Sequence, residues 1–143
     1  ASVLDSARMV NAAGLKVIVD LHALPAGGNR SIGTRQILED PAVFDAYVEL
    51  VRRMARTLAM EDPDKVAFEL MNEPTQGCAD AEGADWTDKV ARLFAAARAS
   101  ATRLTLVLSG ACSGNSEGLA ALQPSAFPTP TSCGRSTPTI RSC

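Results

Sequence analysis

The stretch Val66-Ala67-Phe68-Glu69-Leu70-Met71-Asn72-Glu73-Pro74 decides how the rest of the chain is interpreted. It begins as an apolar, strand-like run and stops abruptly on a carboxamide, a carboxylate and a proline. Proline has no backbone N–H to donate to a sheet, and it favours extended backbone in the residue before it. We therefore expect Pro74 to end a buried strand and to hold Glu73 out at its tip. A lone polar residue at a strand end is ordinarily solvated surface, so the surrounding chain must show whether a site is built there.

The composition of the 143-residue chain limits the classes of protein to which it belongs. Apolar residues make up 46%, charged residues 21%, and the net charge is -2. This suits one domain with a buried core, or part of a larger domain. No basic stripe is present, and no apolar run reaches the roughly 18 residues of a membrane span. We therefore expect neither nucleic acid nor a membrane as a partner. Because the chain starts at Ala1 without Met, we interpret it as an excerpt or a mature chain.

Helical and strand-like patterns alternate along the sequence. Apolar spacing predicts helices near residues 4–13, over 41–58 with Asp40 as its cap, and from about 86 to 100. Apolar, β-branched runs predict strands over 15–22, 66–74 and 104–108. The stretches 23–40 and 75–85 are expected to be loops, and 114–122 to be loop with one short helix. The alternation predicts an α/β fold in which the strands form a parallel sheet.

Polar side chains gather where the predicted strands end. Asp20 and His22 end the first strand, Asn72 and Glu73 the second, and Ser109 follows the third. In parallel α/β folds these carboxyl ends share one edge of the sheet, where binding sites are built. No glycine-rich phosphate loop follows any of the strands, which favours part of a (β/α)8 barrel over an open, doubly wound sheet. A whole barrel needs about 250 residues, so this chain would supply less than half of one.

Three segments together carry a resemblance to a known family. Val17-Ile18-Val19-Asp20-Leu21-His22, Pro25-Ala26-Gly27 and Phe68–Pro74 resemble glycoside hydrolase family 5, the cellulase-type β-glycanases, over about residues 4–127. The resemblance implies a partial (β/α)8 TIM barrel and retaining hydrolysis of a β-linked glucan-type polysaccharide. It implies no cofactor, and a full-length form that is a monomer. We expect residues 1–127 to be part of the catalytic domain and residues 128–143 to be a disordered or out-of-frame tail.

The resemblance also assigns roles to three residues. Glu73 would be the general acid/base, Asn72 would contact the sugar 2-hydroxyl, and His22 would contact a sugar hydroxyl beside the cleavage point. A retaining glycosidase needs such an acid to protonate the leaving oxygen and a second carboxylate to attack the sugar. The family's nucleophile, and its His-x-Tyr motif, have no counterpart in this sequence; Glu117 has nothing to place it opposite Glu73. The chain as given is therefore expected to be inactive.

Other residues near the strand ends have competing interpretations. We expect Asp20 to be structural, and Glu69 to be an interior carboxylate paired with a residue outside the chain. Trp86 is expected to pack in the core, although an aromatic ring could also stack on a sugar. Asn29 and Arg30 fit a solvated loop at least as well as they fit a sugar subsite.

A metal site and two other functions are alternatives for this chain. Asp20, His22 and Glu73 could ligate a metal, but no His-x-x-x-His or paired-cysteine spacing supports this, so we expect none. A non-catalytic remnant that binds carbohydrate remains an alternative, as does an unrelated α/β domain that binds a small ligand. Activity on a soluble β-glucan, and the effect of β-glucan oligosaccharides on stability, would separate these alternatives.

The end of the chain and its cysteines raise separate questions. Thr131–Cys143 has almost no apolar pattern, yet permitted codons read one base earlier give Asp-Val-Val-Trp-Ser-Phe-His-Pro-Tyr, a strand ending in the missing motif. We hypothesise that this tail is out of frame, which would make Cys133 and Cys143 artefacts. Cys78 and Cys112 lie in predicted loops at the same sheet edge, as a disulfide or as free thiols. A disulfide would indicate a secreted or periplasmic protein.

Overall fold

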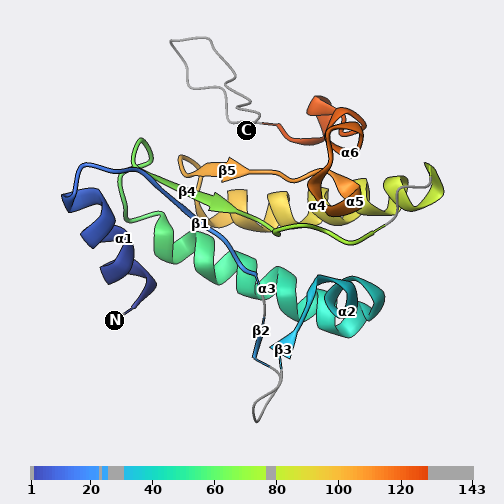
Figure 1. Cartoon of the computed structure of the whole chain (residues 1–143), viewed down its shortest axis with the longest axis horizontal. Coiled ribbons are helices and arrows are strands. Elements are labelled where there is room, and N and C mark those ends of the chain that lie inside the picture. The colour runs from blue at the N-terminus through green and yellow to red at the C-terminus, as the bar shows by residue number, and fades with distance from the viewer. Residues whose placement is uncertain (1, 23, 26–30, 77–79, 129–143) are drawn as a thin grey trace.

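The computed structural model describes residues 2–22, 24–25, 31–76 and 80–128 (Figure 1). Within them, β1, β4 and β5 form a parallel sheet in the order β1-β4-β5, and β2 pairs with β3 as a short antiparallel ribbon. The elements in chain order are α1 (Val3–Ala12), β1 (Val17–Val19), β2 (Leu24–Pro25), β3 (Ser31–Ile32), α2 (Thr34–Glu39), α3 (Pro41–Leu58), β4 (Val66–Glu69), α4 (Asp80–Ser100), β5 (Thr105–Val107), α5 (Ala111–Gly114), α6 (Ser116–Ala120) and the 3-10 turn η1 (Pro124–Ala126).

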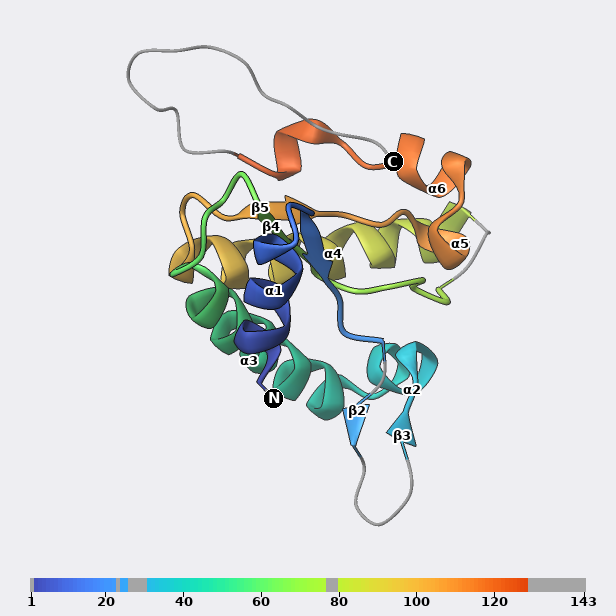
Figure 2. The same ribbon diagram turned by 60° about the vertical axis from the view of Figure 1, so that its left-hand side comes forward.

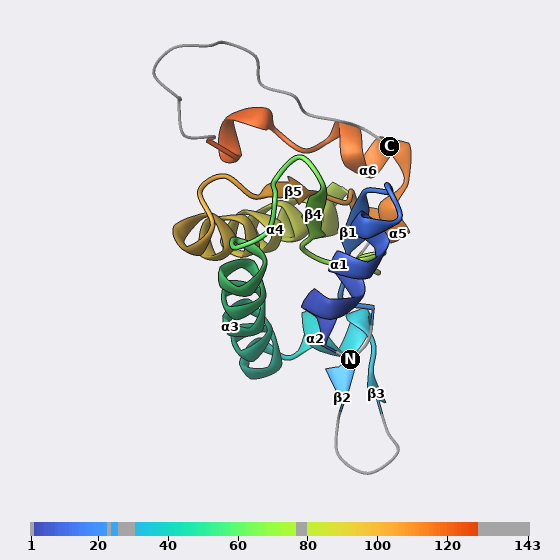
Figure 3. The same cartoon turned by 90° about the vertical axis from the view of Figure 1, so that its left-hand side faces the viewer.

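Helices α3 and α4 lie side by side on one face of the parallel sheet (Figures 1 and 3). The side chains of Val66 and Phe68 on β4 and of Leu70 just after it are almost fully buried. The side chain of Ile18, which lies on the opposite face of β1, is 50% exposed. Alternate residues of a strand point to opposite faces. One face of the sheet therefore forms the core, whereas the other is open around Ile18.

Helix α3 forms where the sequence predicts it. The Asp40 carboxylate accepts the N–H groups of Ala42 and Val43 at 2.9 and 3.2 Å, and Pro41 occupies the first helical position. Such a cap satisfies N–H groups that have no partner within the helix. The buried residues follow one helical stripe, comprising Phe44, Tyr47, Val51, Ala55 and Leu58. Both the predicted cap and the predicted bounds are confirmed.

Two predicted loops are wrong in part. The stretch 23–40 contains β2, β3 and the whole of α2 (Figure 2). The side chains of Ile37 and Leu38 on α2 are buried. Helix α4 begins at Asp80, six residues before its predicted start. A six-residue helix is too short to show a clear apolar period, and the residues before Trp86 carry charge and glycine in place of an apolar stripe. The apolar spacing that predicts a helix is therefore missing from α2 and from the part of α4 before Trp86.

The strands are shorter than predicted, and the chain after β5 is more helical. Regular pairing in β4 ends at Glu69, five residues before Pro74, and β1 ends at Val19. Over 114–122, where loop and one short helix were expected, α6 is that helix; α5 before it and η1 after it were not predicted. This segment returns to α4, where the rings of Phe127 and Phe94 meet edge to face with centroids 5.4 Å apart. Among the described helices, none is long and apolar enough to span a lipid bilayer.

Candidate active site

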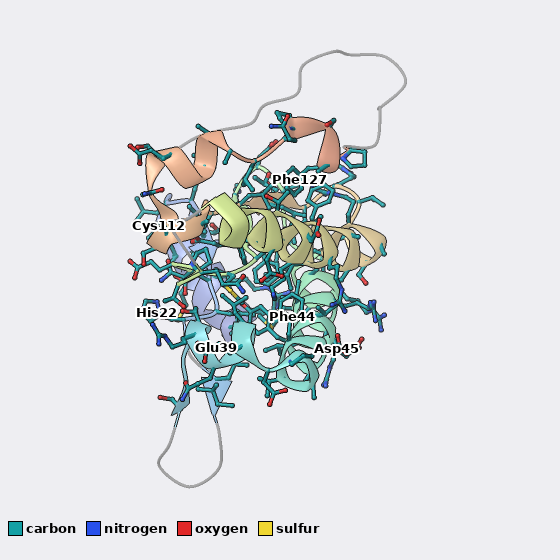
Figure 4. All side chains as sticks on the ribbon, turned by 90° about the vertical axis from the view of Figure 1, so that its right-hand side faces the viewer. His22, Glu39, Phe44, Asp45, Cys112 and Phe127 are labelled. Atoms are coloured by element: carbon teal, nitrogen blue, oxygen red, sulfur yellow. The ribbon has the colours of Figure 1, made fainter. Side chains whose placement is uncertain are left out.

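The carboxyl ends of the three parallel strands meet at one edge of the sheet, as predicted. Register pairs Val19 with Phe68, and Glu69 with Val107, so that the chain leaves each strand at the same edge. Figure 4 looks onto this side of the molecule and labels His22. The segments that follow β1, β4 and β5 therefore lie close enough to build a shared site.

His22 and Asn72 are in direct contact at this edge. Asn72 Nδ2 lies 2.7 Å from His22 Nδ1, although 50 residues separate them in sequence. An amide nitrogen only donates, so in this arrangement Nδ1 accepts and the ring proton sits on Nε2. The imidazole of His22 is exposed, which leaves Nε2–H available as a donor. The structure thus brings together two of the residues predicted to bind the sugar.

Glu73 follows Asn72 with an exposed side chain and an unusual backbone. Its φ is 46°, in the left-handed region, so the expectation that Pro74 would hold it extended is wrong. For a residue other than glycine, that conformation is about 1–2 kcal/mol less favourable than the right-handed one. Its carbonyl oxygen accepts a hydrogen bond from Thr34 Oγ1 on α2 at 3.3 Å. Strain of this kind persists where surrounding contacts hold it, and it is frequent at active sites.

A second layer of polar contacts lies further down the strands. Ser109 Oγ donates to Glu69 Oε1 at 2.5 Å, and Trp86 Nε1 donates to the Ser109 carbonyl at 3.0 Å. Glu69 therefore has a partner within the chain, which corrects the expectation that its partner lies outside. Trp86 is 1% exposed, so it packs in the core as predicted and is not a sugar-stacking platform.

Tyr47 ties α3 to the strand that leads to the site. Its hydroxyl donates to the Leu70 carbonyl at 2.8 Å. Burial raises the pKa of Tyr47 well above its ordinary value, and the negative charges of Asp20 and Glu69 add to the rise. Tyr47 lies in the helix predicted over 41–58 and was not among the predicted site residues; the signal that could have singled it out is that a buried tyrosine hydroxyl usually needs a hydrogen-bond partner.

The loops after β4 and β5 are joined by their backbones. Cys112 N–H donates to the Gln76 carbonyl at 2.8 Å, and Ser113 N–H donates to the Pro74 carbonyl at 2.9 Å. Cys112 is disulfide-bonded, which settles that it is not a free thiol. Cys78 lies outside the described residues.

The remaining candidates are Asp20, a possible metal site, and residues that lie outside the described part of the chain. Asp20 is exposed, and the described residues contain no group of three His, Cys, Asp or Glu side chains that could hold a metal ion. The candidates Asn29 and Arg30, and the tail from 131 to 143 with its two cysteines, also lie outside the described residues. Thr34 was missed because it falls in a stretch predicted to be loop.

Comparison with known proteins places this architecture in a family. The sequence profile of the cellulase family (glycosyl hydrolase family 5) matches residues 3–134. A comparison with curated protein sequences gives no match.

Similar solved structures include the cellulose synthase subunit Z of Clostridioides difficile, at 18% identity and a TM-score of 0.63 over 84% of this chain and 36% of that one. Thermotoga maritima Cel5A, solved with mannotriose, gives 18% identity and a TM-score of 0.61 over 84% of this chain and 36% of that one. The catalytic domain of Thermobifida fusca endoglucanase Cel5A gives 19% identity and a TM-score of 0.55 over 85% of this chain and 34% of that one.

These likenesses establish the fold. The alternating helices and parallel strands form part of a (β/α)8 barrel, and the chain spans about a third of the length of its structural neighbours, with 36% and 34% in two of them. The family profile covers most of the sequence. The chain belongs to the cellulase family, glycosyl hydrolase family 5, a family of glycosidases.

Proposed function

We propose that this chain carries the acid/base half of a retaining β-glycanase, with Glu73 as the general acid and base. The observation that carries the proposal is the cluster at the carboxyl edge of the sheet. There Glu73 has an exposed carboxyl group and a constrained backbone, and it directly follows an Asn72 side chain that is 2.7 Å from His22. Family membership supports the reaction class, since glycosidases place paired carboxylates at this end of a barrel.

The chemistry requires Glu73 to work in two directions. As an acid, it protonates the oxygen of the leaving sugar while an oxocarbenium-like transition state develops on the other sugar. As a base, it then takes a proton from the water that releases the glycosyl–enzyme intermediate. An exposed carboxyl group at a sheet edge can reach both the leaving oxygen and the water that replaces it.

Asn72 and His22 would bind the sugar at the reacting centre. Asn72 Nδ2 is directed to His22 Nδ1, which fixes the plane of the amide and leaves Oδ1 on its other side to accept a sugar hydroxyl. A contact to the 2-hydroxyl strengthens in the transition state and so contributes to rate as well as to binding. His22 Nε2–H would donate to a neighbouring hydroxyl.

The nucleophile is proposed to lie outside these 143 residues. In a retaining enzyme the second carboxyl group lies about 5–5.5 Å from the first. The chain spans 34–36% of the length of its structural neighbours, which leaves room for that residue elsewhere in a whole barrel. We therefore propose that the chain alone is inactive and that activity requires the remaining strands.

A comparison of leaving groups tests the assignment of Glu73. The enzyme is a polypeptide in which this chain is continued to a complete barrel, assayed on cello-oligosaccharides, manno-oligosaccharides and dinitrophenyl β-cellobioside. Removal of a general acid typically costs about 10²–10⁴-fold in rate. Glu73→Ala should lose this much kcat/KM on the oligosaccharide, whose leaving group needs a proton. On the dinitrophenyl substrate, which needs none, the glycosylation step should change little.

Other outcomes of the same assay would overturn the proposal. Equal losses on both substrates would show that Glu73 does not act as the acid. Oligosaccharide binding with no hydrolysis by the complete barrel would favour the non-catalytic carbohydrate-binding alternative. Asn72→Ala is the matched comparison: it should lower the rate on both kinds of substrate, because its contact with the 2-hydroxyl does not depend on the leaving group.

A further inference from the structure

A turn after β5 contacts the backbone that carries Glu73. Cys112 and Ser113 are consecutive residues with φ values of 57° and 58°, in the left-handed region that side chains disfavour. Their two N–H groups donate to the carbonyls of Gln76 and Pro74 at 2.8 and 2.9 Å. Pro74 immediately follows Glu73. An unfavourable conformation at two successive residues thus directs two donors onto the loop of the proposed acid/base.

The turn itself is held by a close crossing of two backbones. A Cβ atom added to Gly118 on α6 would lie 2.5 Å from the carbonyl oxygen of Ala111, the residue before the turn. A Cβ atom on Gly110 would collide with the backbone nitrogen of Leu119 in the same way. Only glycine fits at these positions. The disulfide at Cys112 adds a covalent restraint to the turn, and Figure 4 labels Cys112 on the same side of the molecule as His22.

Thr34 contacts the same loop from another element of the fold. Its hydroxyl donates to the Glu73 carbonyl at 3.3 Å, and it opens α2, which is anchored by the buried Ile37 and Leu38. The side chain of Gln36 accepts the Gly33 N–H at 2.9 Å and fixes the start of that helix. The carbonyls of residues 73, 74 and 76 are therefore all bound by groups from α2 or from the turn.

We propose that Thr34 and the Cys112–Ser113 turn are positioning residues that hold Glu73 in its left-handed conformation and so direct its carboxyl group toward the scissile bond. The inference rests on the proposed function of Glu73. Its physical basis is that a left-handed Glu before a proline is unfavourable in isolation and is maintained by bonds to the carbonyls on its C-terminal side. Neither element touches the substrate; both act through the backbone of the β4–α4 loop.

The first test uses the 143-residue chain and needs no catalysis. Gly118→Ala should force Ala111 and the turn to move, so amide exchange at Cys112 and Ser113 should accelerate at least tenfold relative to the amide of Phe68. Because the turn bonds the loop that carries Glu73, the NMR resonances of Glu73 should also shift in Gly118→Ala. Leu104→Ala is the control: it opens a cavity at the other end of β5, so it should speed exchange through general destabilisation while leaving the Glu73 resonances in place. Unchanged Glu73 resonances in Gly118→Ala would overturn the proposal.

A second pair of variants keeps the test decisive if Gly118→Ala does not fold. Thr34→Val removes the hydroxyl, whereas Thr34→Ser keeps it. The Glu73 resonances should shift in Thr34→Val and return to those of the parent in Thr34→Ser. The same shift in both variants, or in neither, would contradict a role for the hydroxyl.

Catalysis then separates this inference from the proposed function. In the complete barrel, Thr34→Val should lower kcat/KM on cello-oligosaccharide at least threefold more than on dinitrophenyl β-cellobioside, with Thr34→Ser restoring the ratio. If Glu73→Ala shows the leaving-group difference and Thr34→Val does not, the positioning claim fails and the function stands. If Glu73→Ala shows no difference, the proposed function fails, and the NMR result alone decides whether these groups hold the loop.

Discussion

The two ends of the parallel sheet are held by different kinds of contact. At the amino end, Arg98 Nη1 donates to the carbonyls of Ala101, Thr102 and Leu104 at 2.9–3.0 Å, and Thr105 Oγ1 donates to the Pro63 carbonyl at 3.1 Å. At the carboxyl end, the backbone is strained. All the described residues other than glycine that have positive φ lie there, namely Glu73, Cys112 and Ser113.

The difference shows how one sheet serves two purposes. In α/β barrels the carboxyl end carries the chemistry and the amino end contributes stability. Side chains at the amino end satisfy carbonyls that would otherwise be left without partners. At the carboxyl end, contacts between loops maintain a conformation that the loops would not adopt alone. Substitutions at the amino end should therefore change stability, whereas those at the carboxyl end should change function and can even improve stability.

The largest loss of stability is expected in the middle of the sheet, on its buried face. Phe68 is fully buried at 0% exposure between the sheet and its helices. Phe68→Ala should lower the free energy of unfolding by about 3–5 kcal/mol, the usual loss for a buried phenylalanine. Ile18→Ala, on the opposite face where the side chain is 50% exposed, should cost about 1 kcal/mol, since half of its apolar area already faces water. Urea unfolding of both variants measures this, and equal losses would show that the two faces are not different.

The amino end should show its stabilising role at Arg98. Arg98→Met removes the guanidinium, which binds three carbonyls and lies over the Phe94 ring with Cζ 5.3 Å from its centroid, so the free energy of unfolding should fall by about 2 kcal/mol. Arg92→Met is the matched change, because Arg92 makes one exposed ion pair with Asp45 and should cost under about 1 kcal/mol. Thermal and urea unfolding measure the loss of stability in each of the two variants. A shift of the Glu73 resonances in Arg98→Met would contradict the separation of the two ends.

Tyr47 links the core to the carboxyl end and should make stability depend on pH. Burial raises the pKa of Tyr47 above that of the unfolded chain, with Asp20 and Glu69 contributing next. The stability it provides is therefore complete below pH of about 10, the ordinary tyrosine value, and is lost as the pH rises further. Tyr47→Phe should cost about 1 kcal/mol near neutral pH by removing the bond to the Leu70 carbonyl. Unfolding at pH 8 and pH 11 should show the alkaline loss in the parent and a smaller one in the variant.

The smallest effect should have the opposite sign. Glu73→Gly replaces a strained left-handed residue and should raise the free energy of unfolding by about 0.5 kcal/mol, after the extra freedom of glycine in the unfolded chain is subtracted. Glu49→Gly in α3 is the comparison, since glycine inside a helix should lower stability by about 1 kcal/mol. Differential scanning calorimetry can resolve the two. A loss in Glu73→Gly would mean that the conformation is not strained.

The sequence predicted the parts of the fold that depend on local pattern. Asp40 and Pro41 mark the start of α3 because capping involves only neighbouring residues. The alternation of apolar runs predicts the parallel sheet, and the sheet in turn predicts that segments following β1 and β4 meet, as the contact between His22 and Asn72 confirms.

The remaining features depend on contacts between residues far apart in the chain. The left-handed backbone of Glu73 runs against the local preference before proline; Thr34, 39 residues away, bonds its carbonyl. In the sequence, Cys112 and Ser113 are ordinary loop residues. Their role depends on the hydrogen bonds from their N–H groups to the carbonyls of Gln76 and Pro74, which only the structure shows. Helix α2 is stabilised by the burial of Ile37 and Leu38, and six residues are too few for an apolar period to predict that burial.

The most direct test of Glu73 as acid/base is the product formed when azide replaces the missing carboxylate. In Glu73→Ala of the complete barrel, azide can enter the vacated space and attack the glycosyl–enzyme from the face that water normally uses. The account predicts that azide restores turnover of dinitrophenyl β-cellobioside and gives the β-glycosyl azide, with retained configuration. The α-glycosyl azide would identify Glu73 as the nucleophile instead, and no rescue with no azide product would contradict its role as acid/base.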